Sequence, residues 1–511
     1  MGLLQIFFFV VALWGLDAPF VSMHFVRQNQ TFDVARHVFH EGWSAVITPR
    51  ASFSQLSAPD DTFSPLITPS PRFTIIHLEV PFHGIFGWPA AVVFKQHERA
   101  IVRLVSVMFA LLSIRLLYLV LRHWLEPSFA LAGTALWTTA PVIIHFGQVP
   151  TPDILATTGL AAAFLFALRG QTALSSVAFL FSLLAKLSII IYGLPVLTAF
   201  LIARDCRSVG QFIKLSLAWG LIPLLGVLVW LSLSWSDPFG SWVILGGYRA
   251  GGYGPVGLKD WMHPGFYVRP MMYLFPFGCG LLGIIGGWFA LRSKVVRMHP
   301  WLKVSIIAGV ACNYAFERIV WIEPQYTVPV LFWLVVAVSF GFPRLFEFLG
   351  RDHRRRAVLG GILLVHIAVM IAAVCFLKAS RVPNLRDLEA AARLTPVDSR
   401  IVVYASTPSA SPSAWLDRNT LKLGPLPNVA SAQWDVFAQQ LQSVQKAGFD
   451  YLLVFDVEGH ESMNFLETFE QETPYVTNYT DRALPTRRFF DDRFRKIFEG
   501  DHVVLYRMAQ P

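Results

Sequence analysis

The segment from Ser128 to Leu168 reads SFALAGTALWTTAPVIIHFGQVPTPDILATTGLAAAFLFAL and is apolar over almost its whole length. A helix needs roughly 20 apolar residues to cross about 30 Å of hydrocarbon. Two such helices fit here, over 128–146 and 151–168, and a short polar turn separates them. The segment therefore predicts two transmembrane helices in series, with Asp153 in the first turn of the second.

The rest of the chain is also rich in apolar residues. Of its 511 residues, 54% are hydrophobic and only 15% are charged, which is more apolar surface than soluble domains can bury. Segment 2–23 lacks the basic start and the cleavage site of a secretory signal, so we expect an uncleaved first span, with a signal peptide as the alternative. We predict a multi-span α-helical membrane protein of about eleven transmembrane helices. The other predicted spans are 101–122, 171–187, 188–204, 211–235, 270–291, 303–321, 326–346 and 357–378.

The positions of Lys and Arg predict how these helices are oriented. The formal net charge of +9 comes from short basic clusters between apolar segments, which argues against a face that binds nucleic acid. If the first span leads outward, nearly all Lys and Arg of the short loops face the cytoplasm, as the positive-inside rule requires. Residues 24–100, 236–269 and 379–511 then lie on the non-cytosolic side. The predicted cytoplasmic clusters are Arg122, Arg169, Arg204 with Arg207, 292–303 and 344–356.

The chain changes character after residue 379. RIVVYAS (Arg400–Ser406) and YLLVFDV (Tyr451–Val457) have the pattern of buried strands, a helical stretch over 430–447 separates them, and 501–508 adds another strand. This order predicts a small C-terminal α/β domain, 380–511, with an open parallel sheet, after a transmembrane domain of residues 1–379. Because no Gly-rich phosphate loop follows the first strand, we do not expect nucleotide binding there.

Polar residues concentrate on the predicted outer side. The outer loop 24–100 begins with RQNQTFDVAR (Arg27–Arg36), which fits an amphipathic helix on the membrane surface. Further along this loop, Glu79 has apolar neighbours, where a carboxylate is costly to leave unpaired. Asp153 at a helix N-terminus is favoured by the helix dipole, so a simple capping role explains it as well as a functional one.

The charged residues among these suit a phosphate group. Lys186 and Arg318 fall at outer ends of predicted spans, where ionisable groups are candidates for function. Long Lys and Arg side chains also extend to the membrane–water interface without a functional role. Together with Arg27 these two residues could neutralise a phosphate, and Glu79 or Asp33 could accept a proton from a hydroxyl. A transferase for polyprenyl-phosphate sugars needs these groups, because the phosphate leaves, the lipid tail lies in the bilayer and the acceptor is deprotonated.

A series of short motifs follows along residues 1–350. They are Ala35-Arg36 with Gly42, Glu79-Val80-Pro81-Phe82, Arg103-Leu104-Val105-Ser106, Gly147-Gln148 through Pro152-Asp153, Lys186 with Pro195, and Glu323-Pro324-Gln325-Tyr326 with Pro329. In this order they resemble the C superfamily of membrane-embedded glycosyltransferases (GT-C), which includes protein O-mannosyltransferases and lipid A aminoarabinose transferases. The resemblance implies a GT-C fold and inverting transfer of a hexose or pentose from a polyprenyl-phosphate donor. Arg27–Thr31 is similar to a loop of a bacterial branch, which implies the bacterial inner membrane.

The same resemblance implies roles for individual residues. We expect Glu79 to be the catalytic base, ahead of Asp33, because many superfamily members place an Asp early in the first outer loop, where this chain has Gln28 and Asn29. The superfamily has metal-dependent and metal-independent members, and no ligand spacing predicts a metal site here, so a divalent metal is left open. The expected phosphate-binding residues are Arg27, Lys186 and Arg318, and the expected substrate-binding residues are Gln28, Gln30, Gln148, Asp153, Glu323 and Tyr326.

Two other functions fit parts of the pattern. A transporter or flippase of lipid-linked sugars often has repeated halves and broken helices near the bilayer centre, but this sequence shows no repeat, and its polar residues cluster at one face. A non-catalytic relative that binds lipid-linked sugar without transferring it is the other alternative, because the early Asp is missing. Lipid, glycan and protein acceptors all remain open, and the sequence does not identify the sugar.

Overall fold

The computed structural model of the chain describes residues 1–14, 16, 25–47, 50–51, 75–76, 79–94, 97–234, 262, 264–292, 298–316, 326–350, 353–378, 385–396, 399–405, 419–423, 441–442, 444–446, 448–455, 490–500 and 503–508. The chain divides into two compact units, which are described in turn. The first unit contains residues 1–18, 35–49 and 77–379, and the second contains residues 19–34, 50–76 and 380–511. Separate domains of residues 1–379 and 380–511 stay a prediction.

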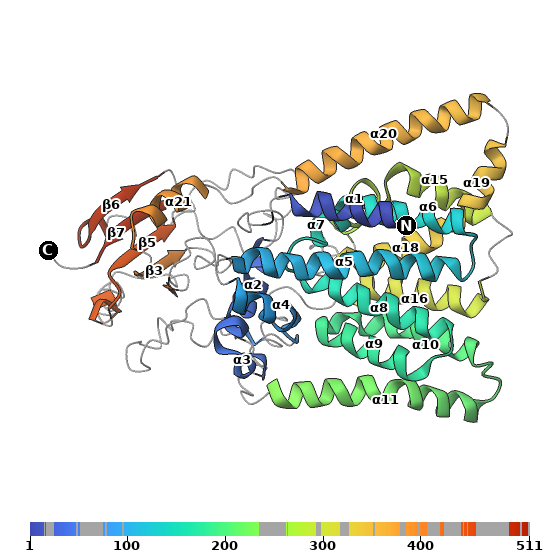
Figure 1. Ribbon diagram of the computed structural model, residues 1–511, viewed down its shortest axis with the longest axis horizontal. Coiled ribbons are helices and arrows are strands. Elements are labelled where there is room, and N and C mark those ends of the chain that lie inside the picture. Colours follow the sequence, from blue (N-terminus) through green and yellow to red (C-terminus); the bar gives the residue numbers. More distant parts are fainter. Residues whose placement is uncertain are drawn as a thin grey trace. The chain divides into compact units, whose positions relative to one another are not determined.

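The first unit is a bundle of helices (Figure 1). Within the described residues, four helical stretches are long and apolar enough to cross a membrane, and the bent pair Thr327–Ser339 with Phe342–Leu349 would make a fifth. The predicted total of about eleven spans stays a prediction. The helices are α1 (Gly2–Leu13), α4 (Phe82–Val93), α5 (Glu98–Arg122), α6 (Pro127–Thr139), α7 (Pro141–Phe146), α8 (Pro152–Leu168), α9 (Thr172–Ala185), η3 (Leu187–Tyr192), α10 (Gly193–Ala203), α11 (Val209–Ser234), α14 (Pro264–Leu274), η4 (Phe275–Cys279), α15 (Gly280–Arg292), α16 (Pro300–Phe316), α18 (Thr327–Ser339), α19 (Phe342–Leu349) and α20 (His353–Lys378).

Several predicted spans are pairs of shorter helices in series. The span 128–146 is α6 followed by α7, and the break lies at Ala140, whose backbone is extended. Pro141 explains the break, because proline cannot donate the next helical hydrogen bond and disfavours helical geometry in the preceding residue. Likewise, the span 188–204 corresponds to η3 and α10, while α9 ends just before Lys186.

Helix α8 lies at the centre of the bundle. Its residues are buried on all sides, and it packs against α5, α9 and α10. A Cβ atom at position 159 would lie only 2.9 Å from Phe181 and 3.0 Å from Ser182, so the glycine allows α9 to approach closely. One turn from the start of α8, the Ser182 hydroxyl of α9 donates a 2.6 Å hydrogen bond to the Ala156 carbonyl. These contacts fix α8 and α9 against each other.

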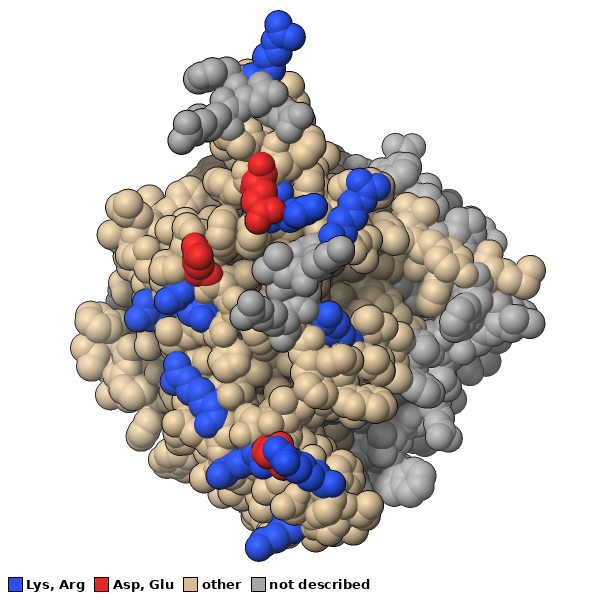
Figure 2. All heavy atoms as spheres, turned by 90° about the vertical axis from the view of Figure 1, so that its right-hand side faces the viewer, with Lys and Arg blue, Asp and Glu red and all other residues tan. Residues whose placement is uncertain are grey.

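The loops at one end of the bundle are basic. Helices α5, α8 and α10 end there, and α6, α9 and α11 begin there (Figure 1). Figure 2 shows this face, where Lys and Arg side chains are spread widely and Asp and Glu are few. Burial and nearby Arg169 lower the pKa of His123, just beyond α5, as expected beside a second cation. The described basic residues of these loops and the adjoining helix ends are Arg122, Arg169, Arg204, Arg207, Arg292, Lys303, Arg344 and Arg354, and the acidic ones are Glu126, Asp205 and Glu347.

The predicted surface helix coincides with α2 (Phe25–Glu41), which is followed by α3 (Trp43–Ile47), and its place at the membrane surface stays a prediction. The boundary between the two units falls within α2. The half of α2 that belongs to the first unit packs closely on α4, because a Cβ atom at position 84 would lie only 2.7 Å from Val38. Arg36 and His40 then pair with Glu98 at 3.0 and 2.9 Å. Glu98 is in the first turn of α5, where the helix dipole also favours a carboxylate.

The second unit contains a five-stranded sheet. Its strands are β3 (Arg400–Ala405), β4 (Asn419–Leu423), β5 (Tyr451–Phe455), β6 (Arg495–Glu499) and β7 (Val503–Arg507), in the order β4-β3-β5-β7-β6. The three predicted strands are confirmed, but the prediction of a parallel sheet is wrong in part: β3 pairs in parallel with β4 and β5, whereas β7 is antiparallel to β5 and β6. Most of the predicted helix 430–447 lies outside the described residues.

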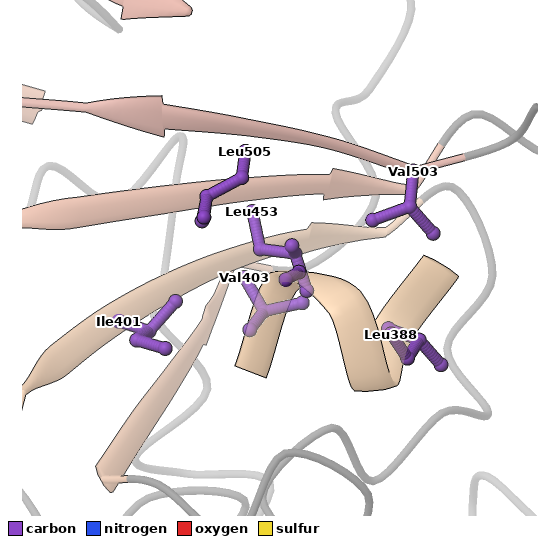
Figure 3. Close-up of a cluster of buried hydrophobic side chains, with 7 residues drawn as sticks. Leu388, Ile401, Val403, Leu453, Val503 and Leu505 are labelled. Carbon is purple, nitrogen blue, oxygen red and sulfur yellow. The ribbon is translucent and has the colours of Figure 1, made fainter. Parts of the chain in front are cut away.

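One face of this sheet packs on helix α21 (Leu385–Arg393). Leu388 of α21 belongs to one buried cluster with Val403, Leu453 and Leu505 of the sheet (Figure 3), and all four side chains are fully buried. The register explains the shared face, because Val403 pairs with Leu453 and Leu453 pairs with Leu505. The second unit also contains the short antiparallel pair β1 (Arg50–Ala51) and β2 (Ile75–Ile76).

The close approach of α8 and α9 predicts the effect of a larger residue at Gly159. Gly159→Val should lower the free energy of unfolding by about 1–3 kcal/mol, because the added methyl groups overlap Phe181 and Ser182. Gly220→Val in α11 is the matched control, because a side chain there meets nothing within 4 Å. Thermal unfolding in detergent measures both variants, and equal unfolding temperatures would contradict the proposed contact.

Candidate functional site

A buried ion pair lies at the end of the bundle opposite the basic loops. Lys186 Nζ donates to Asp153 Oδ1, and the two side chains are 6% and 0% exposed. Asp153 is in the first turn of α8, and Lys186 directly follows α9. Because α8 starts where α9 ends, residues 33 positions apart in the sequence meet here.

The helix ends favour this arrangement of charges. The N-terminus of α8 carries partial positive charge that stabilises Asp153, and the C-terminus of α9 carries partial negative charge that stabilises Lys186. The Nζ of Lys186 also lies 3.2 Å from the centre of the Tyr326 ring, which adds a cation–π interaction. Tyr326 immediately precedes α18, so three separate helix ends supply this cluster.

Glu79 belongs to the same end of the bundle. The backbone N–H of Val80 donates a 2.8 Å hydrogen bond to the carbonyl of Leu184, two residues before Lys186. This bond fixes the segment that carries Glu79 beside the end of α9. The Glu79 side chain is partly exposed, whereas Asp153 is fully buried, so Glu79 is the more accessible of these two carboxylates.

A second polar chain connects this segment to the turn before α8. His83 of α4 makes a 2.9 Å hydrogen bond with the hydroxyl of Ser106 in α5, and that hydroxyl donates a 2.8 Å hydrogen bond to the Val149 carbonyl. His83 is 3% exposed and Ser106 is fully buried. Neither residue was among the predicted site residues, although an ionisable residue and a hydroxyl within apolar helices are the kind of signal that could have identified them.

The structure places only part of the predicted site together. Asp153, Lys186 and Tyr326 are in contact, and Glu79 is on a segment bonded beside them. Gln148 is buried in the turn between α7 and α8. Gln28 and Asp33 are buried residues of α2 in the second unit. Outside the described side chains lie Arg27, Gln30, Arg318 and Glu323, so their predicted roles stay predictions.

The described residues contain no group of three or more His, Cys, Asp or Glu side chains able to hold a metal ion. Among the described side chains, Lys186 is paired with Asp153, and Glu79 lies on the neighbouring segment, whose Val80 is bonded to Leu184. Such a set can bind an anionic oxygen through the ammonium group and accept a proton through the more exposed carboxylate.

Comparison with known proteins gives a clear result for the fold. No protein-family model and no curated protein sequence matches the chain. Among solved structures, ArnT from Cupriavidus metallidurans bound to undecaprenyl phosphate is similar, with a TM-score of 0.62 and 15% identity over 99% of this chain and 97% of that chain. The apo structure of ArnT gives a TM-score of 0.60. The oligosaccharyltransferase AglB from Archaeoglobus fulgidus, in complex with an inhibitory peptide and a dolichol-phosphate, gives 0.54 and 11% identity over 99% of this chain and 74% of that chain.

These likenesses confirm the fold that the motifs predicted. ArnT, an aminoarabinose transferase, and AglB are both GT-C glycosyltransferases, and the match extends over nearly the whole of this chain. Because the sequence identities are only 11–15%, these similarities show a shared fold and nothing further. The chain thus has the fold of these GT-C proteins, and several of its described helices are long and apolar enough to cross a membrane.

The buried ion pair predicts an asymmetric response to substitution. Asp153→Asn should cost about 3–5 kcal/mol of stability, because it leaves the Lys186 ammonium group buried without its counter-charge. The double variant Asp153→Asn with Lys186→Met should recover most of that loss, since it removes both charges. Unfolding temperatures in detergent of the single and double variants measure this coupling.

An exposed ion pair provides the control for this prediction. Glu347 pairs with Arg344 at 3.3 Å, and both side chains are more than half exposed. Glu347→Gln should therefore change stability by only about 0–1 kcal/mol. If Asp153→Asn is as mild as Glu347→Gln, or if the double variant is no more stable than Asp153→Asn alone, the pair does not have the assigned importance.

Proposed function

We propose that the chain is a glycosyltransferase that moves a sugar from a polyprenyl-phosphate donor to an acceptor at the non-cytosolic face of the membrane. The observation that carries the proposal is the Lys186 ammonium group, held between Asp153 and Tyr326 at the end of an apolar helix bundle. A cation at this depth suits a ligand with a charged phosphate and a hydrocarbon tail, because the tail lies in lipid while the phosphate reaches the helix ends. The GT-C fold supports this choice of chemistry.

The donor phosphate would take Lys186 as its counter-charge, with Arg27 and Arg318 as further predicted contacts. In the reaction, an acceptor hydroxyl oxygen attacks the anomeric carbon, and the bond from that carbon to the phosphate oxygen breaks. The polyprenyl phosphate departs with the bonding electron pair, and the acceptor proton passes to a carboxylate. Attack opposite the leaving group inverts the anomeric configuration.

Glu79 is our first choice for the proton acceptor and Asp33 the second. Glu79 is supported by its partly exposed side chain and by the hydrogen bond that fixes its segment beside Lys186. Asp153 is less suited, because its carboxylate is fully buried and already accepts from Lys186. Asp153 and Tyr326 would then hold Lys186 in position, and the buried Gln148 belongs to the turn that leads into Asp153.

The transfer reaction provides the test of this function. With radiolabelled undecaprenyl-phosphate hexoses and pentoses as donors and total membrane extract as the acceptor source, Glu79→Gln should lower kcat about 10²–10⁴-fold, because the proton acceptor is lost. Asp33→Asn tests the second candidate in the same assay. Lys186→Met should raise the KM for the donor. Glu347→Gln, an exposed residue of α19 with no assigned part in the site, should behave as wild type.

The outcomes separate three classes of protein. If neither Glu79→Gln nor Asp33→Asn lowers transfer, the assignment of the base is wrong. If the purified protein binds the donor but label never reaches an acceptor, the chain is a binding relative. If the protein in vesicles instead moves intact donor from one leaflet to the other, it is a transporter.

The proposed orientation places the basic loops in the cytoplasm of a bacterial inner membrane. Cys206 lies in the loop between α10 and α11, within this basic face, and is partly exposed. A membrane-impermeant maleimide should therefore label Cys206 in inverted membrane vesicles but not in intact spheroplasts. The Cys206→Ser variant should lose this labelling, and labelling of Cys206 in intact spheroplasts would reverse the orientation.

A further inference from the structure

His83 is buried in the first turn of α4, and the direction of its hydrogen bond can be deduced. The Ser106 hydroxyl has one hydrogen atom, and it donates that hydrogen to the Val149 carbonyl, which can only accept. In its 2.9 Å contact with His83, Ser106 must therefore be the acceptor. It follows that Nε2 of His83 carries a hydrogen atom, which the Ser106 oxygen accepts.

This chain of hydrogen bonds ends in the turn that starts α8. The Val149 carbonyl also accepts a 2.8 Å hydrogen bond from the backbone N–H of Thr151, which is the N-cap residue of α8. Asp153 follows two residues later. The hydroxyl of Ser106 thus holds the backbone at the point from which the Asp153 carboxylate is directed toward Lys186.

The segment Glu79–His83 is therefore bonded to the structure on both sides of the ion pair. At one end, the Val80 N–H is bonded to Leu184, which precedes Lys186 by two residues. At the other end, His83 is bonded through Ser106 to Val149, which precedes Asp153 by four. This segment of five residues thus connects the end of α9 with the turn before α8.

We propose that His83 is a positioning residue, whose Nε2–H acts through the Ser106 hydroxyl to fix the Glu79 segment relative to the Asp153–Lys186 pair. The inference rests on the proposed transferase function, which it deepens by naming residues that set the geometry without touching the reacting atoms. Loss of this bond should displace Glu79 while the Lys186–Asp153 contact remains, since Ser182 joins α8 and α9 independently. His83 then affects the chemical step rather than the binding of the donor phosphate.

Two amide substitutions give a matched test. Glutamine places a donor N–H close to the position of Nε2 in histidine, whereas the shorter asparagine reaches only the position of Nδ1. We expect His83→Asn to lower kcat about tenfold to a hundredfold, because a displacement of about 1 Å has an effect of this size. His83→Gln should stay within about threefold of wild type, and the Kd for undecaprenyl phosphate should change less than about twofold in both variants. Ser106→Ala, which leaves His83 in place, should reproduce the loss seen in His83→Asn.

Hydrogen–deuterium exchange tests the same inference without enzymatic activity. In His83→Asn and Ser106→Ala, the backbone amides of Val80 and Thr151 should exchange faster than in wild type, whereas His83→Gln should preserve their protection. Unchanged exchange in every variant, equal losses of kcat in the Gln and Asn variants, or faster exchange with no change in kcat would each overturn the positioning role. Faster exchange in an enzyme whose wild type shows no transfer would retain the hydrogen-bonded connection and reject the proposed function instead.

Discussion

The buried contact between Asp153 and Lys186 is the constraint on which the rest of the site depends. Two opposite charges, nearly inaccessible to solvent, are held within a bundle made mostly of apolar side chains. Neither charge could remain there alone, because an unpaired buried ion is very costly. The helix ends must therefore meet: α8 has to start, and α9 has to end, at the same place. Gly159 and Ser182 make that meeting possible by allowing the two helices to approach closely.

The two ends of the bundle carry different sets of charged residues. The loops at one end carry Arg122, Arg169 and Arg204, which suits a surface facing the cytoplasm. The other end holds Lys186 with its carboxylate and aromatic partners, together with the segment of Glu79. A lipid-linked donor could reach such a cluster laterally from the membrane, with its phosphate at the helix ends. The proposed transferase function follows from this combination of charge, depth and fold.

Sequence patterns predicted the positions of many described helices, because a long apolar run is compatible with few structures besides a membrane-spanning helix. The run 101–122 became α5, and Asp153 was predicted at a helix N-terminus, where the structure has it. Pairing of Asp153 with Lys186 could not be predicted, since it depends on how α8 packs on α9. The hydrogen bond between His83 and Ser106 could not be predicted for the same reason, because packing brings these two polar residues together. In the five-stranded sheet, the strands missed were β4 and β6, which lie at its two edges and have mixed polar sequences, NTLKL and RKIFE.

An experimental structure of the protein with undecaprenyl phosphate bound tests the central claim most directly. We expect a phosphate oxygen within hydrogen-bonding distance of Lys186 Nζ, roughly 2.7–3.2 Å, while the isoprenoid chain extends into the membrane. Asp153 and Tyr326 would still flank the lysine. A phosphate bound elsewhere, with Lys186 still enclosed by Asp153 and Tyr326 and out of contact with the ligand, would contradict the assignment of this cluster as the donor site.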